Sequence, residues 1–363
     1  MSRQMKISNI KLRPVSAPMK RPLVTSIATL TASPLLLIDL QTDAGIVGHS
    51  YLFGVGQHNL PAIAKLVEAM TEMVKGDEVA PLELERKLRA RYALLGVHNI
   101  VLFAMSGIDM AAWDALAQSL GLPLARLLGA APRPIPAYNS KGLGIMPLPA
   151  LAKETAELLA EGFRAIKLRM GRAEARDDME ALRAVKKATG PGIILMVDFN
   201  QALTVAEALK RGRLIDEEGG VSWIEEPIRA DDFAGAARLT REIATPIQLG
   251  ENFMGPEQMA QALAAGACDY VMPDAQRIGG VTGWMRAAAL AQGAGAEMSS
   301  HLFPEVSAHL LAATPTCHWL EYVDWANPVL ERPLELKDGQ VLIPSQPGTG
   351  IAWDEKAVER YKL

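Results

Sequence analysis

The sequence has few cysteines, no long apolar run and no strong excess of charge, and each shortage excludes a class of protein. Cys268 and Cys317 form no CxxC spacing, so neither a disulfide framework nor a structural zinc site is expected. The 37 basic and 41 acidic residues leave a net charge of −4 at pH 7, which argues against a general electrostatic hold on nucleic acid or an anionic membrane. We therefore expect no nucleic acid or membrane partner.

Neither a signal peptide nor a membrane span is indicated. The N-terminus continues into alternating apolar and polar residues instead of an apolar core of about 7–15 residues. The longest apolar stretches, such as 34–40 and 287–291, fall short of the roughly 20 residues that cross a bilayer. A soluble protein in the reducing cytoplasm is the expectation.

The length of 363 residues predicts about two domains. Strand-like segments at 5–15 and 35–40 flank an expected loop at 19–34, and helical patterns follow at 58–75, 81–95 and 100–120. Strands followed by helices indicate an α+β domain. We expect this domain over residues 1–130, a second domain over 131–330, and a segment, 331–363, that returns to the first.

Short apolar strands alternate with alanine-rich helices in the second domain. The eight expected strands are 135–138, 165–168, 193–197, 222–224, 246–249, 270–272, 297–299 and 318–322, with helices at 150–159, 178–188, 205–217, 256–264 and 282–292. This repeat requires parallel strands, and a (β/α)₈ barrel of roughly 200 residues fits the chain. An open doubly wound sheet is the alternative, but no GxGxxG motif follows the first strand.

Polar side chains occupy the ends of these strands, where barrel enzymes place their chemistry. The series is Lys167 and Arg169, Asp198 and Asn200, Glu225, Glu251, Asp274, His301 and Glu321. Its members from Asp198 onward are about one βα unit apart, so we expect them to share one rim of the barrel.

Three neighbouring carboxylates in this series predict a metal site. Asp198, Glu225 and Glu251 would repel one another unless a cation neutralised them. Ligation by oxygen alone suits Mg²⁺, with Mn²⁺ as an alternative. The competing interpretation is that each acid caps a helix or pairs with a lysine. Because side chains alternate along a strand, Glu225 is expected to face the axis, and Glu226 to support a neighbour or form an ion pair.

Two further pairs are candidates for proton transfer or substrate binding. Lys167 and Arg169 are two residues apart on one strand and point to the same side, unless they are solvated surface charges. His301 and Asp274 could form a dyad in which the carboxylate fixes the imidazole tautomer. A satisfied buried histidine is the alternative for His301.

These residues and their surroundings resemble the mandelate racemase subgroup of the enolase superfamily over essentially the whole chain. The matching motifs are Ile108-Asp-Met-Ala-Ala-Trp-Asp-Ala115, Val197-Asp-Phe-Asn-Gln201, Trp223-Ile-Glu-Glu-Pro227, Gly250-Glu-Asn252, Met272-Pro-Asp274, Ile278-Gly-Gly-Val-Thr-Gly-Trp284, Ser299-Ser-His-Leu302 and His309-Leu-Leu-Ala-Ala-Thr-Pro315. The resemblance implies a modified (β/α)₈ barrel, a capping domain built from both chain ends, and Asp198, Glu225 and Glu251 as Mg²⁺ ligands.

The resemblance also implies a chemistry, namely abstraction of the proton α to a small-molecule carboxylate to give an enediolate. His301, oriented by Asp274, becomes the general base. Lys167 adds positive charge, and Glu321, if protonated, donates to the substrate carboxylate. Asn200 and Ser140 are expected to contact the substrate.

One position departs from the family pattern. Mandelate racemase-like proteins carry Lys-x-Lys on the second strand, whereas this chain has Lys167-Leu168-Arg169. A guanidinium group is a poor base near neutral pH, which argues against two-base racemisation. A single base permits β-elimination, so we predict a dehydratase that converts an acid-sugar-type hydroxy acid to a 2-keto acid.

Two alternatives stay open. Leu23, Ile27 and Leu30 form an apolar series in the segment that covers the substrate in the family, which favours a racemase or epimerase of an apolar 2-hydroxy acid, unless they only pack the cap onto the barrel. A catalytically silent protein that binds metal and carboxylate is the other. The resemblance also implies a homo-oligomer, with an octamer as the candidate assembly.

Overall fold

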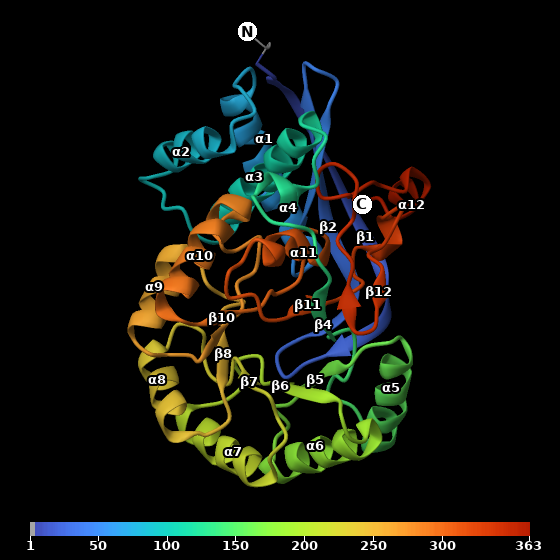
Figure 1. Ribbon diagram of the computed structural model, residues 1–363, viewed down its shortest axis with the longest axis vertical. Coiled ribbons are helices and arrows are strands. Elements are labelled where there is room, and N and C mark those ends of the chain that lie inside the picture. Colours follow the sequence, from blue (N-terminus) through green and yellow to red (C-terminus); the bar gives the residue numbers. More distant parts are fainter. Residues whose placement is uncertain (1–3) are drawn as a thin grey trace.

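A three-stranded antiparallel sheet and a ring of parallel strands form the two parts of the computed structural model, which describes residues 4–363 (Figure 1). The antiparallel sheet consists of β1 (Ile7–Val24), β2 (Thr29–Thr42) and β3 (Val47–Phe53). The short helix η1 (Gln57–Asn59) and the helices α1 (Leu60–Val74), α2 (Pro81–Arg91), α3 (Asn99–Ser119) and α4 (Leu124–Leu127) follow it. We call β1–β3 with η1 and α1–α4 the cap.

The eight strands of the ring run parallel and close on one another. They are β4 (Ile135–Asn139), β5 (Ala165–Arg169), β6 (Ile194–Asp198), β7 (Ile224–Glu225), β8 (Ile247–Leu249), β9 (Tyr270–Val271), β10 (Glu297–Met298) and β11 (Leu320–Tyr322). Backbone hydrogen bonds from His318 to Met298 and from Ser300 to Trp319 join the last two strands, and β11 pairs with β4. The predicted fold class, a (β/α)₈-type barrel with an α+β cap, is confirmed.

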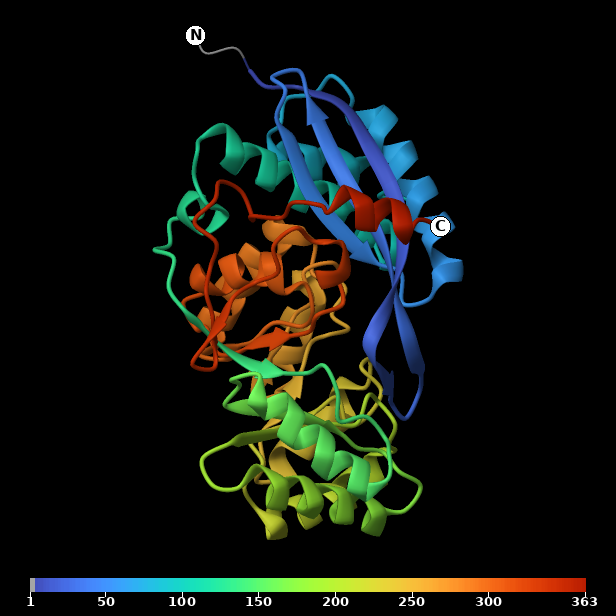
Figure 2. The same cartoon turned by 90° about the vertical axis from the view of Figure 1, so that its right-hand side faces the viewer.

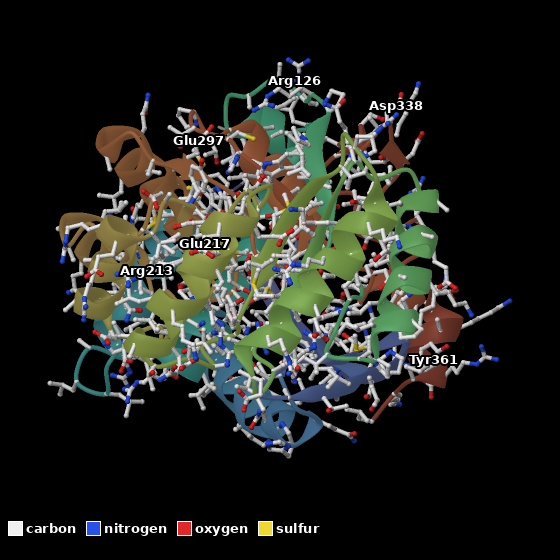
Figure 3. All side chains as sticks on the ribbon, turned by 90° about the horizontal axis from the view of Figure 1, so that it is seen from below. Arg126, Arg213, Glu217, Glu297, Asp338 and Tyr361 are labelled. Atoms are coloured by element: carbon white, nitrogen blue, oxygen red, sulfur yellow. The ribbon has the colours of Figure 1, made fainter. Side chains whose placement is uncertain are left out.

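Helices cover the outside of this barrel because each has one apolar face. They are α5 (Leu148–Ala160), α6 (Ala175–Thr189), α7 (Val205–Glu218), α8 (Phe233–Glu242), α9 (Pro256–Ala264), α10 (Gly280–Ala294) and α11 (Pro304–Ala312). In α7, for example, Leu209 and Ile215 are buried, while Arg213 and Glu217 are exposed on the outer surface (Figure 3). The sequence patterns missed β3, α4, α8 and α11.

The expectation of a loop at 19–34 is wrong. This segment is the far end of a long hairpin in which β1 pairs with β2 as far as Val24 and Thr29, and it extends beside the barrel (Figure 2). Proline is unusual inside a strand, yet this one contains Pro14, Pro18 and Pro22. They lie on β1, which is an edge strand and therefore tolerates residues without an N–H group.

The C-terminal segment runs back across the cap (Figure 2). It follows η2 (Asn327–Val329) and contains β12 (Leu336–Lys337), β13 (Gln340–Val341) and α12 (Glu355–Arg360). Trp353 Nε1 donates to Asp39 of β2 at 2.8 Å, and the Thr349 N–H donates to Asp114 of α3 at 2.6 Å. The boundaries at residues 130 and 330 themselves remain a prediction.

Helix α3 joins the cap to the barrel. The Asp109 carboxylate accepts hydrogen bonds from the N–H group of Thr282, at 3.0 Å, and from its hydroxyl, at the first turn of α10. Trp113 Nε1 donates to the same hydroxyl at 2.9 Å. The carboxylate thus caps a helix of the other domain, which accounts for two polar residues of the 108–115 motif without catalysis.

Helix α3 is also long and apolar enough, by composition, to span a membrane, although the sequence patterns predict no such segment. However, 83% of its most apolar 18-residue window is buried within the protein. It lies against β3, α1 and α10 and is therefore a core helix.

We expect Asp109 to make stability depend on pH. Burial raises its pKa to about 7, so between about pH 4 and 7 the folded protein holds a proton that the unfolded chain does not. Wild-type stability should therefore fall as pH rises through this range. Between pH 5 and pH 8, the free energy of unfolding of Asp109→Asn, measured with urea, should rise by about 2–3 kcal/mol relative to that of wild type.

The exposed Asp231 offers a control. Between pH 5 and pH 8, the free energy of unfolding of Asp231→Asn should change relative to that of wild type by less than about 0.5 kcal/mol. Parallel pH profiles for wild type and Asp109→Asn would contradict the assignment.

Candidate active site

Three carboxylates meet where β6, β7 and β8 end. Asp198 and Glu225 are the last residues of β6 and β7, and Glu251 follows β8 by two residues. One oxygen from each lies within 4.8 Å of the other two. Asp198 and Glu225 are buried, and Glu251 is partly buried. The parallel register thus brings together the three residues predicted as metal ligands.

Lys167 lies among these acids. Its Nζ is 3.3 Å from Asp198 Oδ2 and 2.8 Å from Glu321 Oε1, and it donates a short hydrogen bond to Glu225 Oε1. The side chain is 1% exposed, which excludes a solvated surface charge. Burial lowers the pKa of Lys167, but Glu225 and Glu321 outweigh burial and hold that pKa well above its ordinary value.

Glu225 and Glu226 point to opposite sides, as the strand alternation predicts. Glu225 contacts Lys167, and its other oxygen accepts a hydrogen bond from Trp223 Nε1 at 3.2 Å. Glu226 accepts a hydrogen bond from the N–H of Gly250 at 3.0 Å, just before Glu251. Burial is the main cause that raises the pKa of each glutamate to about 8.

His301 and Asp274 form the predicted pair. Asp274 Oδ2 lies 2.7 Å from His301 Nδ1, while His301 Nε2 is 3.5 Å from Glu251 and 3.8 Å from Glu321. Burial lowers the pKa of His301, but Glu321, Glu251 and Asp274 outweigh it and raise that pKa to about 9. The dyad therefore fixes one ring nitrogen and leaves the other facing the cavity.

Glu321 is a hydrogen-bond acceptor in this structure. It accepts from Ser140 Oγ at 2.7 Å and from the Leu302 N–H at 3.0 Å. Burial raises its pKa, but the charges of Lys167 and His301 outweigh burial and hold it below its ordinary range. The conditional expectation of a protonated Glu321 donor is therefore corrected, since cations and N–H or O–H donors surround the carboxylate.

Arg169 is buried and held by the loop after β4. Its Nη1 donates to the Gly142 carbonyl and its Nη2 to Ser140 Oγ, both at 2.7 Å. Because an arginine can only donate, the Ser140 hydroxyl must give its own proton to Glu321. The structure also corrects the place expected for Ser140, which is 0% exposed and does not line the cavity. It links Arg169 to Glu321 instead.

Strained backbone surrounds the site. Several residues other than glycine have a left-handed conformation just after a barrel strand, namely Asn200 (φ 46°), Gln201 (φ 66°), Glu226 (φ 39°), Leu302 (φ 48°) and Phe303 (φ 48°). Such conformations cost energy and persist where the surrounding contacts enforce them. For Asn200 these are hydrogen bonds from its N–H and Nδ2 to Asp198, at 2.8 and 3.0 Å.

A cavity of about 200 Å³ opens over these residues. The hairpin covers part of it, and Leu23, Ile27 and Leu30 all line it, together with Asn200. The hairpin is attached to the barrel by hydrogen bonds from the Ile145 N–H to the Val24 carbonyl, at 2.7 Å, and from Ser26 Oγ to the Phe199 carbonyl, at 3.0 Å.

Sequence reasoning missed other residues of the cavity wall, among them Phe53, Val55, Asn252, Gln276, Arg277, Phe303 and Trp325. Gln276 and Arg277 had a usable signal, because they follow the site residue Asp274 by two and three residues in the loop after β9. Phe53 and Val55 had none, since strand β3 itself was not recognised.

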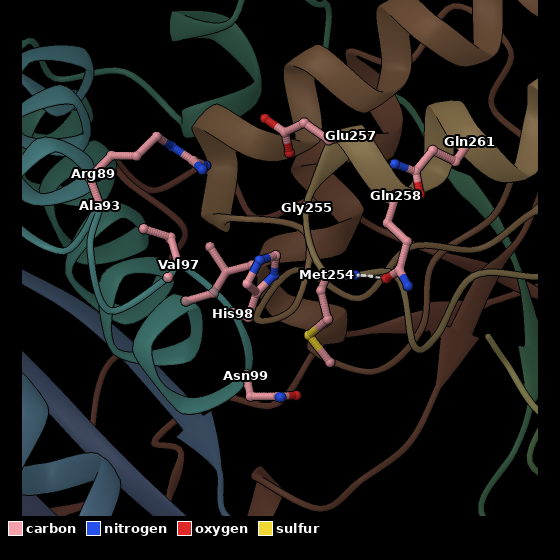
Figure 4. A pocket seen from close by; sticks show the side chains of 12 residues that line it. Arg89, Ala93, Val97, His98, Asn99, Met254, Gly255, Glu257, Gln258 and Gln261 are labelled. Carbon is pink, nitrogen blue, oxygen red and sulfur yellow. Dashed lines mark hydrogen bonds between the residues drawn. The ribbon is translucent and has the colours of Figure 1, made fainter.

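A second hollow, of about 570 Å³, lies between the α2–α3 connection and the start of α9 (Figure 4). Arg89, His98, Glu257 and Gln258 line it, and Gln258 accepts a hydrogen bond from the Met254 N–H. None of the predicted site residues lies there, and it has no cluster of carboxylates.

The donor set of the first cavity fits a divalent metal ion. Asp198, Glu225 and Glu251 offer oxygen atoms only, which hard ions such as Mg²⁺ prefer. Five carboxylates, those three with Asp274 and Glu321, line or lie just beneath this cavity, where Lys167, Arg169 and Arg277 are permanent cations. A bound dication would offset this excess of negative charge.

Comparison with known proteins agrees with the fold and with Mg²⁺ as the cofactor. Residues 7–129 match the profile of the mandelate racemase / muconate lactonizing enzyme N-terminal domain, and residues 150–357 match the enolase C-terminal domain-like profile. The L-talarate/galactarate dehydratase of Salmonella typhimurium is 34% identical over 333 residues, covering 90% of this chain and 82% of that protein.

Two solved structures are similar over nearly the whole length of each chain. An enolase of the alpha proteobacterium bal199 with bound magnesium has a TM-score of 0.97 and 44% identity, covering 99% of this chain and 100% of that one. An enolase from Bradyrhizobium complexed with magnesium and mandelic acid has a TM-score of 0.96 and 40% identity, covering 100% of both chains.

Glu225→Gln should lower the affinity for Mg²⁺ at least about tenfold, because it removes a charged oxygen ligand. Glu226→Gln is the matched control, since the amide keeps an acceptor for the Gly250 N–H and should leave Mg²⁺ binding close to wild type. Isothermal titration calorimetry of both variants measures the difference. Normal binding by Glu225→Gln with loss in Glu226→Gln would reverse the assignment.

Proposed function

The chain belongs to the mandelate racemase / muconate lactonizing enzyme group of the enolase superfamily, and we propose that it is a Mg²⁺-dependent dehydratase of a small hydroxy acid. The observation that carries the proposal is the arrangement around His301, a single base oriented by Asp274 beside the three-carboxylate cluster. The reaction converts an acid-sugar-type 2-hydroxy carboxylate to a 2-keto acid.

The metal site consists of Asp198, Glu225 and Glu251. Bound there, Mg²⁺ would supply Lewis-acid stabilisation of the negative charge that develops on the substrate carboxylate. Lys167 adds a second positive charge at the same place, 2.8 Å from Glu321. Because Lys167 and the metal ligands are buried, their electrostatic effect is larger than it would be in water.

His301 carries out the proton transfers. A dication held by Glu251 would offset part of the negative charge that raises the pKa of His301 and would favour the neutral imidazole, the form that can act as a base. Its Nε2 accepts the α-proton, and the electron pair of the broken C–H bond moves onto the carboxylate to give an enediolate. The electrons then expel the β-hydroxyl group, which takes the proton back from the imidazolium and leaves as water. The resulting enol tautomerises to the 2-keto acid. Asp274 stabilises the imidazolium between the two transfers.

Arg169 supports elimination over racemisation. Its guanidinium group is committed to Ser140 and Gly142, and an arginine rarely gives up its proton. Within residues 4–363, His301 is the one histidine that lines the cavity, and Arg169 does not serve as a second base near neutral pH. A protein that only binds metal and carboxylate has less support, because His301, Asp274 and Glu321 are all in place around the cavity.

A racemase or epimerase of an apolar 2-hydroxy acid is the second candidate. Leu23, Ile27, Leu30 and Phe53 give one wall of the cavity an apolar surface, which suits a hydrophobic substituent. The solved neighbour from Bradyrhizobium is a complex with mandelic acid. A cytoplasmic location and a homo-oligomer, with an octamer as the candidate assembly, belong to the proposal as well.

His301→Asn should reduce turnover about 10²- to 10⁴-fold, because the general base is removed. We expect α-proton exchange in D₂O, followed by NMR, to be lost together with keto-acid formation while Mg²⁺ binding is retained. His58→Asn, at an exposed histidine of the cap, is the control. Undiminished turnover by His301→Asn would show that another group is the base.

Arg169→Lys tests the single-base mechanism. A lysine can lose a proton, so the variant should exchange the α-proton of the C2 epimer that wild type leaves unlabelled, at least tenfold faster than wild type. Arg172→Lys is a matched control on the same side of the barrel. If wild type already exchanges both epimers at similar rates, the racemase candidate replaces the dehydratase.

A further inference from the structure

Arg277 lines the active-site cavity without a carboxylate partner. It follows β9 and Asp274, and it is half-buried. Its Nη1 donates a short hydrogen bond to Asn252 Oδ1, and its guanidinium carbon lies 5.8 Å from the centroid of the Phe103 ring. Within residues 4–363, no Asp or Glu oxygen lies within 4.0 Å of its nitrogen atoms.

The other cations at the cavity are already committed. Lys167 contacts three carboxylates, and His301 lies between Asp274, Glu251 and Glu321. Arg169 has no close acid, but it is 4% exposed and its terminal nitrogens donate to Ser140 and Gly142. Arg277 therefore differs from Lys167 and His301 in having no close acid, and from Arg169 in being half-buried, with one hydrogen bond to a side chain.

The remaining N–H groups of Arg277 are open to the cavity. A guanidinium has five N–H donors, and none of the nitrogens of Arg277 is among the buried side-chain atoms without a partner in the described chain. The guanidinium carbon lies over the Phe103 ring, which accepts no conventional hydrogen bond and so uses none of these donors. The planar edge of a guanidinium matches the two oxygens of a carboxylate.

We propose that Arg277 binds a second carboxylate of the substrate, beyond the one held at the metal site, so that the substrate is a hydroxy dicarboxylate of the aldarate class. This inference rests on the proposed function and names its substrate. Asn252 donates to Glu251 at 3.2 Å as well as accepting from Arg277, so one amide separates the metal site from the anion site. An acyclic diacid can place one carboxylate at the metal site and the other at Arg277.

A purely structural role for Arg277 makes a different prediction. If Arg277 only held Asn252, and through it Glu251, its loss would weaken Mg²⁺ binding and affect every substrate alike. If Arg277 binds the distal carboxylate, its loss affects diacids selectively. The ratio of kcat/KM for an aldarate to that for the aldonate of the same carbon skeleton separates the two roles.

The experiment measures this ratio for the Mg²⁺-loaded enzyme with galactarate and galactonate, and with glucarate and gluconate. Wild type should prefer the aldarate at least tenfold. Arg277→Met should lower the ratio about 10–100-fold, mainly through KM of the aldarate, and Arg277→Lys should restore part of it. Asn252→Ala should leave the ratio within about threefold of wild type, because Arg277 keeps its charge.

Several outcomes would overturn the inference. An unchanged ratio in a folded, Mg²⁺-binding Arg277→Met would show that the residue has a positioning role only, and a wild-type preference for aldonates or for mandelate would exclude the aldarate class. If no acid exchanges its α-proton in D₂O, the proposed function itself fails. If monoacids exchange their α-proton and Arg277→Met leaves the ratio of kcat/KM values unchanged, only this inference fails.

Discussion

Carboxylates that repel one another are held together at the open end of the barrel, and this repulsion determines which other groups the site must contain. Asp198, Glu225 and Glu251 lie within 4.8 Å of one another, largely away from water, where charges interact strongly. Lys167 offsets part of their charge, and a divalent ion would offset more. The same excess of negative charge would also repel an anionic substrate, so the cavity needs the cations that line it.

The backbone around the barrel strands is adapted to this arrangement. Asn200, Glu226 and Leu302 have left-handed conformations in the loops that follow barrel strands, and N–H groups at or beside them reach a site carboxylate or the adjoining loop. The hydrogen bonds made by these groups offset the strain. The stability of the barrel core therefore maintains the geometry of the chemical groups.

The fold class and most of the strand-end residues could be predicted because parallel strands bring their carboxyl ends to one edge. Strand alternation also separated Glu225 from Glu226 correctly. The hairpin could not be predicted, since the prolines of β1 are acceptable only because that strand lies at an edge. The hydrogen bond from Ser140 to Glu321 depends on the conformation of a loop. The hydrogen bonds that Asp109 accepts at the start of α10 depend on how the two domains pack. Neither interaction has a local sequence signal.

The returning C-terminal segment has a consequence for the order in which the protein folds. Asp114 of the cap binds Thr349, 235 residues later, and Asp39 binds Trp353, 314 residues later. On the ribosome the cap is made first, but these buried partners emerge only after the entire barrel has been translated. The cap is thus completed last, and contacts between such distant residues slow folding. A ribosome-bound chain halted before residue 349 would expose cap carboxylates that the finished protein keeps covered.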